Sequence, residues 1–196
     1  MGEKKMIGGI DMWGNMMATQ QLLDGRICRE HGISFERLNA ERFLATTDEI
    51  LEYAKETKCF KYWSVKEPSE IPVRLEEFVD GIHFYLSRGN ELGTNPDDFL
   101  YASHAAKELA KEKQNAIYIG AALSKNAVIS ELLMDAIFHL MRSAKIQLMN
   151  EKRASLFHSL TCYLAVGRLD GFNDRDVEKA YYIKNRENQN RQNTGY

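Results

Sequence analysis

Four acidic residues in the sequence have the spacing of two pairs of metal ligands. Glu49 and Glu52 are three residues apart, and Glu77 and Asp80 repeat the interval. Residues three apart on a helix face the same way, and helices joined by a short connection usually pack antiparallel. Four carboxylates would then meet across one groove. Such an all-oxygen site suits Mg²⁺, whereas a softer metal needs imidazole or thiolate, and neither stands at helical spacing with these acids.

The same acids are also compatible with an ordinary solvated helix face. Lys55 stands three residues from Glu52, and Arg74 stands three from Glu77, so these two acids have local candidates for neutralisation. Phe84 falls on the same face as Glu77, however, and a purely solvated face would not favour a phenylalanine. On spacing alone, both interpretations stay open.

Helical periodicity runs through most of the chain and predicts the elements that position these acids. Only three of the 196 residues are prolines, which favours long helices because proline interrupts them. The stretch "KEPSEIP" separates the two acid-bearing helices. No alternating strand pattern stands out except in 115–121, and residues 1–15 have no clear period. Apolar spacing predicts helices over about 16–30, 35–58, 73–87, 98–113, 126–149, 154–166 and from 173.

Each acid-bearing helix has an apolar face that predicts how it packs. In 73–87 the apolar residues fall within roughly 100° of one another and leave Glu77 and Asp80 on the opposite side. In 35–58 we expect one stripe to face the core, with the glutamates turned away from it: Phe43, Leu44, Thr47, Ile50, Leu51 and Ala54.

Composition limits the class of protein. The chain has 44% hydrophobic and 28% charged residues, which is typical of a soluble globule, and its length predicts one domain over 1–196. The net charge of −2 does not indicate binding to polymeric nucleic acid or to an anionic membrane, both of which attract positively charged proteins. No signal peptide and no apolar run long enough to span a membrane are evident, so we expect a cytoplasmic protein.

The three cysteines form no CxxC pair. Their odd number and spacing argue against a disulfide framework and against a zinc site built of thiolates. We interpret Cys59, Cys162 and the methionines as core filling.

Three further segments accompany the acid pairs, in the order "ETKCFKYWS" (56–64), "LEEFVDGIHFYLS" (75–87) and "AYYIKNRENQNRQNTGY" (180–196). Together they resemble the dimeric all-α dUTPases, members of the all-α NTP pyrophosphatase or MazG-like superfamily, in which an E-x-x-E pair precedes an E-x-x-D pair. The resemblance covers roughly 16–90 and 160–196. It implies an all-α helical bundle of the all-α NTP pyrophosphatase type, with about seven helices, that assembles as a homodimer.

The resemblance also implies roles for the four acids. Glu49, Glu52, Glu77 and Asp80 would bind Mg²⁺ ions that bridge a triphosphate, and Glu49 would also orient or deprotonate the attacking water. The implied reaction converts dUTP and water into dUMP and pyrophosphate. Metal ions suit this chemistry because they neutralise phosphate charge and make water more acidic.

The same resemblance assigns the tail to substrate binding. Lys184, Asn188 and Arg191 stand at i, i+4 and i+7, so a continued helix places them on one face. The two cations would grip phosphate oxygens, and the amide of Asn188 would pair with a uracil edge. We expect the tail to be mobile without nucleotide and ordered over it, while its polar composition alone favours disorder.

Other substrate contacts are implied elsewhere in the chain. Gln20 is expected to read the base, with Gln21 as the alternative if the register shifts, and Phe84 is expected either to stack on the nucleotide or to fill the core. His83 matches a family histidine, although a lone helical histidine is usually structural. Three residues of the "KYWS" region would lie near the phosphates and the partner subunit: Lys58, Lys61 and Trp63.

Two other functions remain open at this stage. A related pyrophosphatase acting on dCTP, a modified pyrimidine nucleotide or dUDP differs only in its base-reading residues. A helical module without catalytic activity would bind a nucleotide or a partner protein and keep the acids only for solubility.

Overall fold

Capping residues fix where two of the helices begin. The Asn95 side chain accepts a hydrogen bond from the backbone N–H of Asp98, and the Asp98 carboxylate accepts one from the Asn95 N–H at 3.0 Å. Asn173 and Asp176 make the same reciprocal pair. Each capping box satisfies donors that a helix start otherwise leaves without a partner, so helices begin directly after both asparagines.

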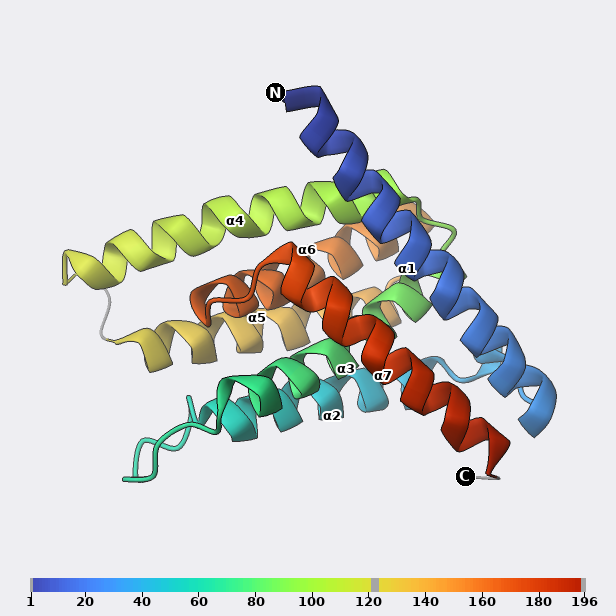
Figure 1. The fold of residues 1–196 in the computed structure, drawn as a ribbon, viewed down its shortest axis with the longest axis horizontal. Coiled ribbons are helices and arrows are strands. Elements are labelled where there is room, and N and C mark those ends of the chain that lie inside the picture. The colour runs from blue at the N-terminus through green and yellow to red at the C-terminus, as the bar shows by residue number, and fades with distance from the viewer. Residues whose placement is uncertain (1, 121–123, 195–196) are drawn as a thin grey trace.

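The computed structural model of the chain describes residues 2–120 and 124–194. Within them the chain forms α-helices and one short 3₁₀ helix, Phe35–Arg37, without any strand (Figure 1). None of the described helices combines the length and apolarity needed to cross a lipid bilayer. The α-helices are α1 (Gly2–His31), α2 (Asn39–Thr57), α3 (Ile71–Glu91), α4 (Pro96–Tyr118), α5 (Lys125–Lys145), α6 (Met149–Leu169) and α7 (Asp174–Asn193).

The all-α prediction is confirmed, although the bounds of most helices differ from those expected, and three of the differences concern which element forms. The region 1–15 had no predicted structure, yet α1 begins at Gly2. The helix expected over 126–149 ends at Lys145, because Ile146 takes extended backbone and a new helix begins at Met149. The possible strand over 115–121 is wrong for 115–118, which complete α4, and residue 121 lies outside the described residues.

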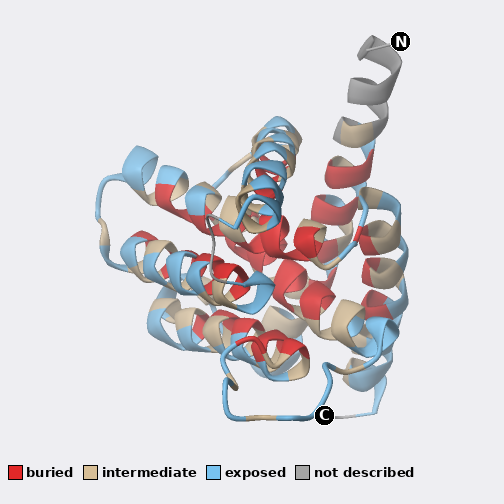
Figure 2. Ribbon diagram, turned by 90° about the vertical axis from the view of Figure 1, so that its left-hand side faces the viewer, coloured by how far each residue is buried: buried red, intermediate tan, exposed pale blue. Residues whose placement is uncertain are grey.

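Helix α3 lies at the centre of the packing. It contacts α1, α2, α6 and α7, while α6 packs against both α4 and α5. Figure 2 shows buried residues concentrated where these helices face one another. The rings of Phe78 on α3 and Tyr163 on α6 stack with centroids 4.6 Å apart, and Tyr53 of α2 meets Phe78 edge-on at 5.4 Å. This aromatic contact fixes the two acid-bearing helices relative to each other.

The predicted core face of α2 is partly wrong: Ile50 and Ala54 are buried as expected, but Leu44 and Leu51 are not. Leu44 and Leu51 are 63% and 42% exposed, whereas Arg42 and Thr46 are buried on the opposite side. The polar residues can occupy the core face because their hydrogen bonds are satisfied: Thr46 Oγ1 donates to the Arg42 carbonyl at 2.7 Å, and Arg42 itself is ion-paired. Apolar periodicity therefore misplaced part of the core face of this helix.

A glycine permits the close approach of α6 to α3. A Cβ atom added at Gly167 would lie 2.5 Å from the Phe78 ring, well inside van der Waals contact. Because Phe78 is itself packed between aromatic neighbours, it has little room to move.

We therefore expect Gly167→Ala to destabilise the protein by about 1–3 kcal/mol, although alanine is the better helix former. Gly25→Ala is the matched control, since a Cβ there meets only the end of the flexible Arg29 side chain, and it should stabilise by about 0.5–1 kcal/mol. Urea unfolding measures both, and two changes of the same sign would contradict the packing described here.

Candidate active site

Three carboxylates from α2 and α3 converge. Glu49 and Glu52 extend from α2 and Glu77 extends from α3, and one oxygen atom of each lies within 4.8 Å of the others. The helices run antiparallel, since α2 also places Arg42 beside Glu91, at the far end of α3, with 2.7 Å between nitrogen and oxygen. The three glutamates are called the acid cluster below.

The fourth predicted ligand, Asp80, is paired with a lysine of α7. The Nζ atom of Lys184 lies 2.8 Å from Asp80 and 2.8 Å from Glu76. Both members of the Asp80–Lys184 pair are largely removed from solvent. Burial alone would lower the pKa of Lys184, but its hydrogen bonds to the two carboxylates outweigh that effect and raise it. Asp80 is thus ion-paired with α7 and is not among the three acids that converge.

Crowding of negative charge distinguishes the acid cluster from a solvated face. Burial first, and then repulsion from Asp80, Glu52 and Glu77, raises the pKa of Glu49 to about 7. Burial followed by Asp80 and Glu52 also raises the pKa of Glu77. The protein therefore assembles these carboxylates without fully compensating their charge, as expected of a site that binds a cation.

Only one of the two local neutralising pairs is present. Lys55 lies 3.7 Å from Glu52, as its spacing predicts. Arg74 instead forms its ion pair with Asp170 at the end of α6. Arg74 therefore holds α3 against α6, and the prediction that it neutralises Glu77 is wrong.

A cavity of about 460 Å³ opens beside the acids, between α1, α2, α3 and α7. Its dimensions fall in the range of small-molecule sites. Acidic residues lie on the α2 and α3 walls, and the α7 wall carries Lys184 and Arg191. The helix predicted for the tail is present, so one face of α7 lines the cavity. The predicted site residues that line it are Gln20, Glu49, Asp80, Phe84, Lys184, Asn188 and Arg191.

Gln20 occupies a fixed position on the α1 wall. Its Nε2 atom donates to Asp24 at 2.8 Å, and its Oε1 atom lies 2.8 Å from a ring nitrogen of His83 and accepts from the Tyr181 hydroxyl at 3.2 Å. The Gln20 side chain is buried and lines the cavity, whereas the Gln21 side chain is exposed. Of the two glutamines, Gln20 is therefore the one placed to contact a ligand in the cavity. Burial, and next Lys184, lower the pKa of His83 to about 3, so the ring is neutral at physiological pH.

The predicted "KYWS" residues do not reach this cavity within one chain. Lys58, Lys61 and Trp63 lie in the connection between α2 and α3, and none of them lines it. Lys58 donates to the backbone carbonyl of Glu67, and Trp63 is 65% exposed beside Tyr62. Their expected contact with substrate is not made in the single chain described here.

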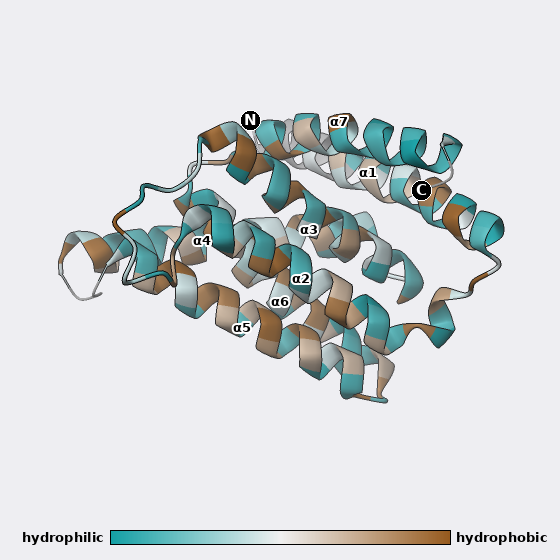
Figure 3. Cartoon of the chain, turned by 90° about the horizontal axis from the view of Figure 1, so that it is seen from below, coloured by the Kyte–Doolittle hydropathy of each residue, from teal (hydrophilic) through white to brown (hydrophobic). Residues whose placement is uncertain are grey.

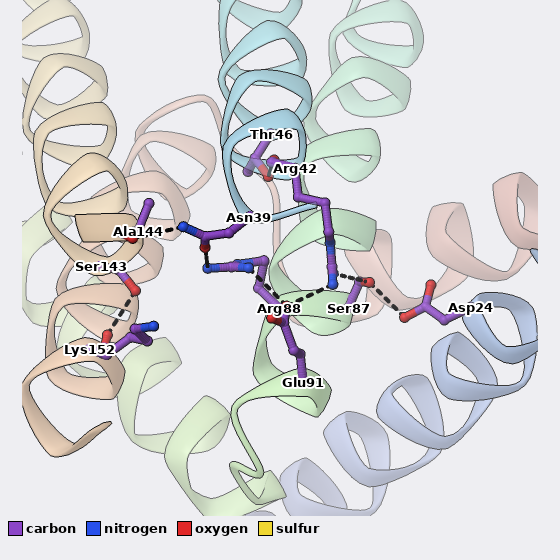
Figure 4. A network of polar contacts seen from close by, with 10 residues as sticks. All are labelled: Asp24, Asn39, Arg42, Thr46, Ser87, Arg88, Glu91, Ser143, Ala144 and Lys152. Atoms are coloured by element: carbon purple, nitrogen blue, oxygen red, sulfur yellow. Dashed lines mark hydrogen bonds and ion pairs between the residues drawn. The ribbon is translucent and has the colours of Figure 1, made fainter. Parts of the chain in front are cut away.

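Asp24 and Arg42 are among the cavity residues that were missed from the sequence. Both bind Ser87: its Oγ atom donates to Asp24 at 2.6 Å and accepts from Arg42 at 2.6 Å. Arg42 also donates to the Glu91 carboxylate, which accepts a second hydrogen bond from Arg88 (Figure 4). Their partners are distant in sequence, so no spacing rule identifies them. The network joins α1, α2 and α3 at the end of the cavity away from the acid cluster.

A family model described as dUTPase matches residues 12–196, almost the whole chain. No curated protein matches the chain.

The raised pKa of Glu49 predicts how stability depends on pH without metal. Glu49 keeps its proton up to about pH 7 in the folded protein but releases it near pH 4.5 when unfolded. Between these values the folded state binds more protons, so this group's contribution to stability falls as pH rises. We expect the melting temperature in a metal chelator to fall across this window more steeply for the wild type than for Glu49→Gln. Identical pH profiles for the two proteins would contradict the charge crowding.

Proposed function

We propose, from the premise that the chain belongs to the all-α dUTPase family and hydrolyses dUTP, that it works as a Mg²⁺-dependent diphosphatase releasing dUMP and pyrophosphate. The acid cluster beside a cavity with cations on its opposite wall is the observation that carries this proposal. A triphosphate lying between two such walls has its charge compensated from both sides.

The residues present fit magnesium. The donors are carboxylate oxygens only, which Mg²⁺ prefers, and the raised pKa values of Glu49 and Glu77 indicate unbalanced negative charge that a cation would relieve. Magnesium ions held by Glu49, Glu52 and Glu77 would neutralise the triphosphate and lower the pKa of a bound water. We assign Glu49 to orient that water and take its proton, because it is the most crowded of the three and a base works best with a pKa near the working pH.

Lys184 links Asp80 to the arrival of substrate. Without nucleotide, Lys184 binds Asp80 and Glu76. Phosphate oxygens would compete for the same ammonium group, and Asp80 would then be released to join the other three acids as a metal ligand. In this proposal the lysine keeps the fourth ligand neutralised until the triphosphate replaces it.

The remaining cavity residues would orient the nucleotide. Arg191 is suited to a bidentate grip on phosphate oxygens. The amides of Gln20 and Asn188 would read the uracil edge, and Gln20 is preorganised for this by Asp24 and His83. Phe84 lines the cavity and is partly exposed, which supports stacking on the base or sugar over a purely core position.

We also propose that the enzyme is a homodimer. Apolar side chains are exposed on the adjacent helices α2 and α5, including Leu44, Leu51, Met134 and Phe138. Hydrophobic segments recur along α5, in contrast to the largely hydrophilic α7 (Figure 3). Burying these side chains against a second copy would remove them from water. Pairing would also give Lys58, Lys61 and Trp63 a route to substrate that the single chain does not provide.

Pyrophosphate release tests the substrate assignment. With Mg²⁺ we expect dUTP to be turned over far faster than dTTP or dCTP, and we expect no turnover in excess chelator. A preference for dCTP or for a modified pyrimidine nucleotide would favour the related enzymes considered above, and phosphate release from dUDP would extend the substrate range. Equal rates with dUTP and dTTP would contradict uracil recognition.

Glu49→Gln should reduce kcat by about 100-fold or more while leaving the fold intact, because the amide cannot accept the proton of water. Glu41→Gln is the matched control, an exposed acid on the same helix that does not line the cavity, and it should keep full activity. Near-normal turnover in Glu49→Gln, with a wild-type circular dichroism spectrum, would remove this residue from the mechanism.

The dimer prediction can be tested by introducing charge at the exposed apolar face. Leu51→Glu combined with Phe138→Glu should convert a dimer to a monomer in light scattering, because each change would bury an unpaired charge in the interface. The double variant Leu22→Glu, Tyr101→Glu changes exposed residues on other helices and should remain dimeric. A monomeric wild type at micromolar concentration would contradict the proposal.

A further inference from the structure

A second set of metal-ligating side chains lies outside the active site, on the hairpin of α5 and α6. Asp135 and His139 are four residues apart on α5, and His158 and Cys162 are four apart on α6. Residues at this spacing share one helix face. These four residues are called the hairpin cluster, and none of them lines the cavity or belongs to the acid cluster.

The register of the hairpin brings the two pairs together. Ser143 of α5 donates to the Lys152 carbonyl of α6 at 2.8 Å (Figure 4), and Ser159 of α6 donates to the Ala136 carbonyl of α5 at 2.6 Å. These contacts define an antiparallel register in which the two histidines lie across from each other and the aspartate lies across from the cysteine. The helix spacing and the hairpin register therefore select the same four positions independently.

Contacts within the hairpin cluster agree with this placement. The rings of His139 and His158 meet edge to face with centroids 5.2 Å apart. Asp135 is near enough to act electrostatically on both His139 and Cys162. The Nδ1 atom of His139 is buried and makes no hydrogen bond to any described residue. A buried polar atom without a partner is unfavourable, and a metal ion would supply one.

We propose that the hairpin cluster binds one Zn²⁺ ion or a chemically similar divalent transition metal. Two imidazoles, a thiolate and a carboxylate form a four-ligand set of the kind that tetrahedral zinc accepts. Magnesium would not be held by nitrogen and sulfur, so the hairpin cluster and the acid cluster select different ions.

The protonation states are compatible with metal uptake. Burial and the neighbouring His158 lower the pKa of His139, which favours the neutral, ligating imidazole. Burial, and then Asp135, raise the pKa of Cys162 to about 11, so the thiol is protonated without metal. Binding then replaces the S–H proton with a sulfur–metal bond and releases that proton to water, without a redox step.

Metal binding at the hairpin cluster requires rotation of its side chains. Among the described residues, only the acid cluster has three ligand atoms already within 4.8 Å of one another. Asp135 and His158 are exposed, and His139 and Cys162 are only partly buried, so all four side chains are free to change rotamer. A bound ion would cross-link the middle of α5 to the middle of α6 and stabilise the folded chain by mass action.

Metal titrations of the intact protein in excess Mg²⁺ test this site. Cobalt(II) should bind at one ion per chain and give sulfur-to-metal charge-transfer absorption. This absorption should vanish in Cys162→Ser and persist in Cys28→Ser, which alters another partly buried free cysteine. In calorimetry, the double variant His139→Ala, His158→Ala should bind Zn²⁺ at least about 100-fold more weakly than wild type. His104→Ala, an exposed histidine of α4, should bind as wild type does.

All four variants should hydrolyse dUTP with Mg²⁺ at the wild-type rate, which shows that they fold. The proposal is overturned if cobalt gives no charge-transfer absorption with wild type or if the absorption survives Cys162→Ser. It is equally overturned if the double histidine variant keeps full Zn²⁺ affinity. None of these outcomes depends on the assignment of the active site.

Discussion

Repulsion among carboxylates is the constraint around which this molecule is organised. Glu49, Glu52 and Glu77 place oxygen atoms within 4.8 Å of one another, and burial strengthens their mutual repulsion. The packing of α2 and α3 must oppose that force. The Tyr53 ring of α2 meets the Phe78 ring of α3 edge-on, and the Tyr163 hydroxyl donates to the Phe78 carbonyl at 2.9 Å, which anchors α6 beneath the acid-bearing turn of α3. A divalent cation would convert this unfavourable arrangement into a favourable one.

The helices at the two ends of the sequence complete the site opposite the acids. The Tyr181 hydroxyl of α7 donates to the Met16 carbonyl of α1 at 3.0 Å, and the same tyrosine ring stacks on His83 of α3. This contact places Lys184 one turn further along α7, where it meets Asp80. Positive charge on α7 and negative charge on α2 and α3 thus face each other across a cavity of nucleotide dimensions.

Local sequence patterns predicted the parts of this arrangement that depend on a single helix. The spacing of the acid pairs, the apolar face of α3 and the helical face of the tail all follow from a period of 3.6 residues. These features are present in the structure, apart from differences at the helix ends. The resemblance to the all-α dUTPases identified the family because several segments matched in order, which helical periodicity alone would not have done.

Features that join distant segments could not be predicted in the same way. The pairing of Lys184 with Asp80 and of Arg74 with Asp170 depends on how α7 and α6 dock onto α3. Arg42 is buried although it is charged. Its burial is explained by its hydrogen bonds to Ser87 and Glu91, which lie on another helix. Apolar periodicity did not separate the two faces of α2, because Ile50 and Ala54 are buried whereas Leu44 and Leu51 are exposed.

A crystal structure with Mg²⁺ and a non-hydrolysable dUTP analogue tests the central claim most directly. The account predicts metal ions coordinated by Glu49, Glu52 and Glu77, with Asp80 released from Lys184 to join them and the lysine bound to phosphate. Metal ions held by the phosphates alone, with these carboxylates turned into solvent, would contradict it.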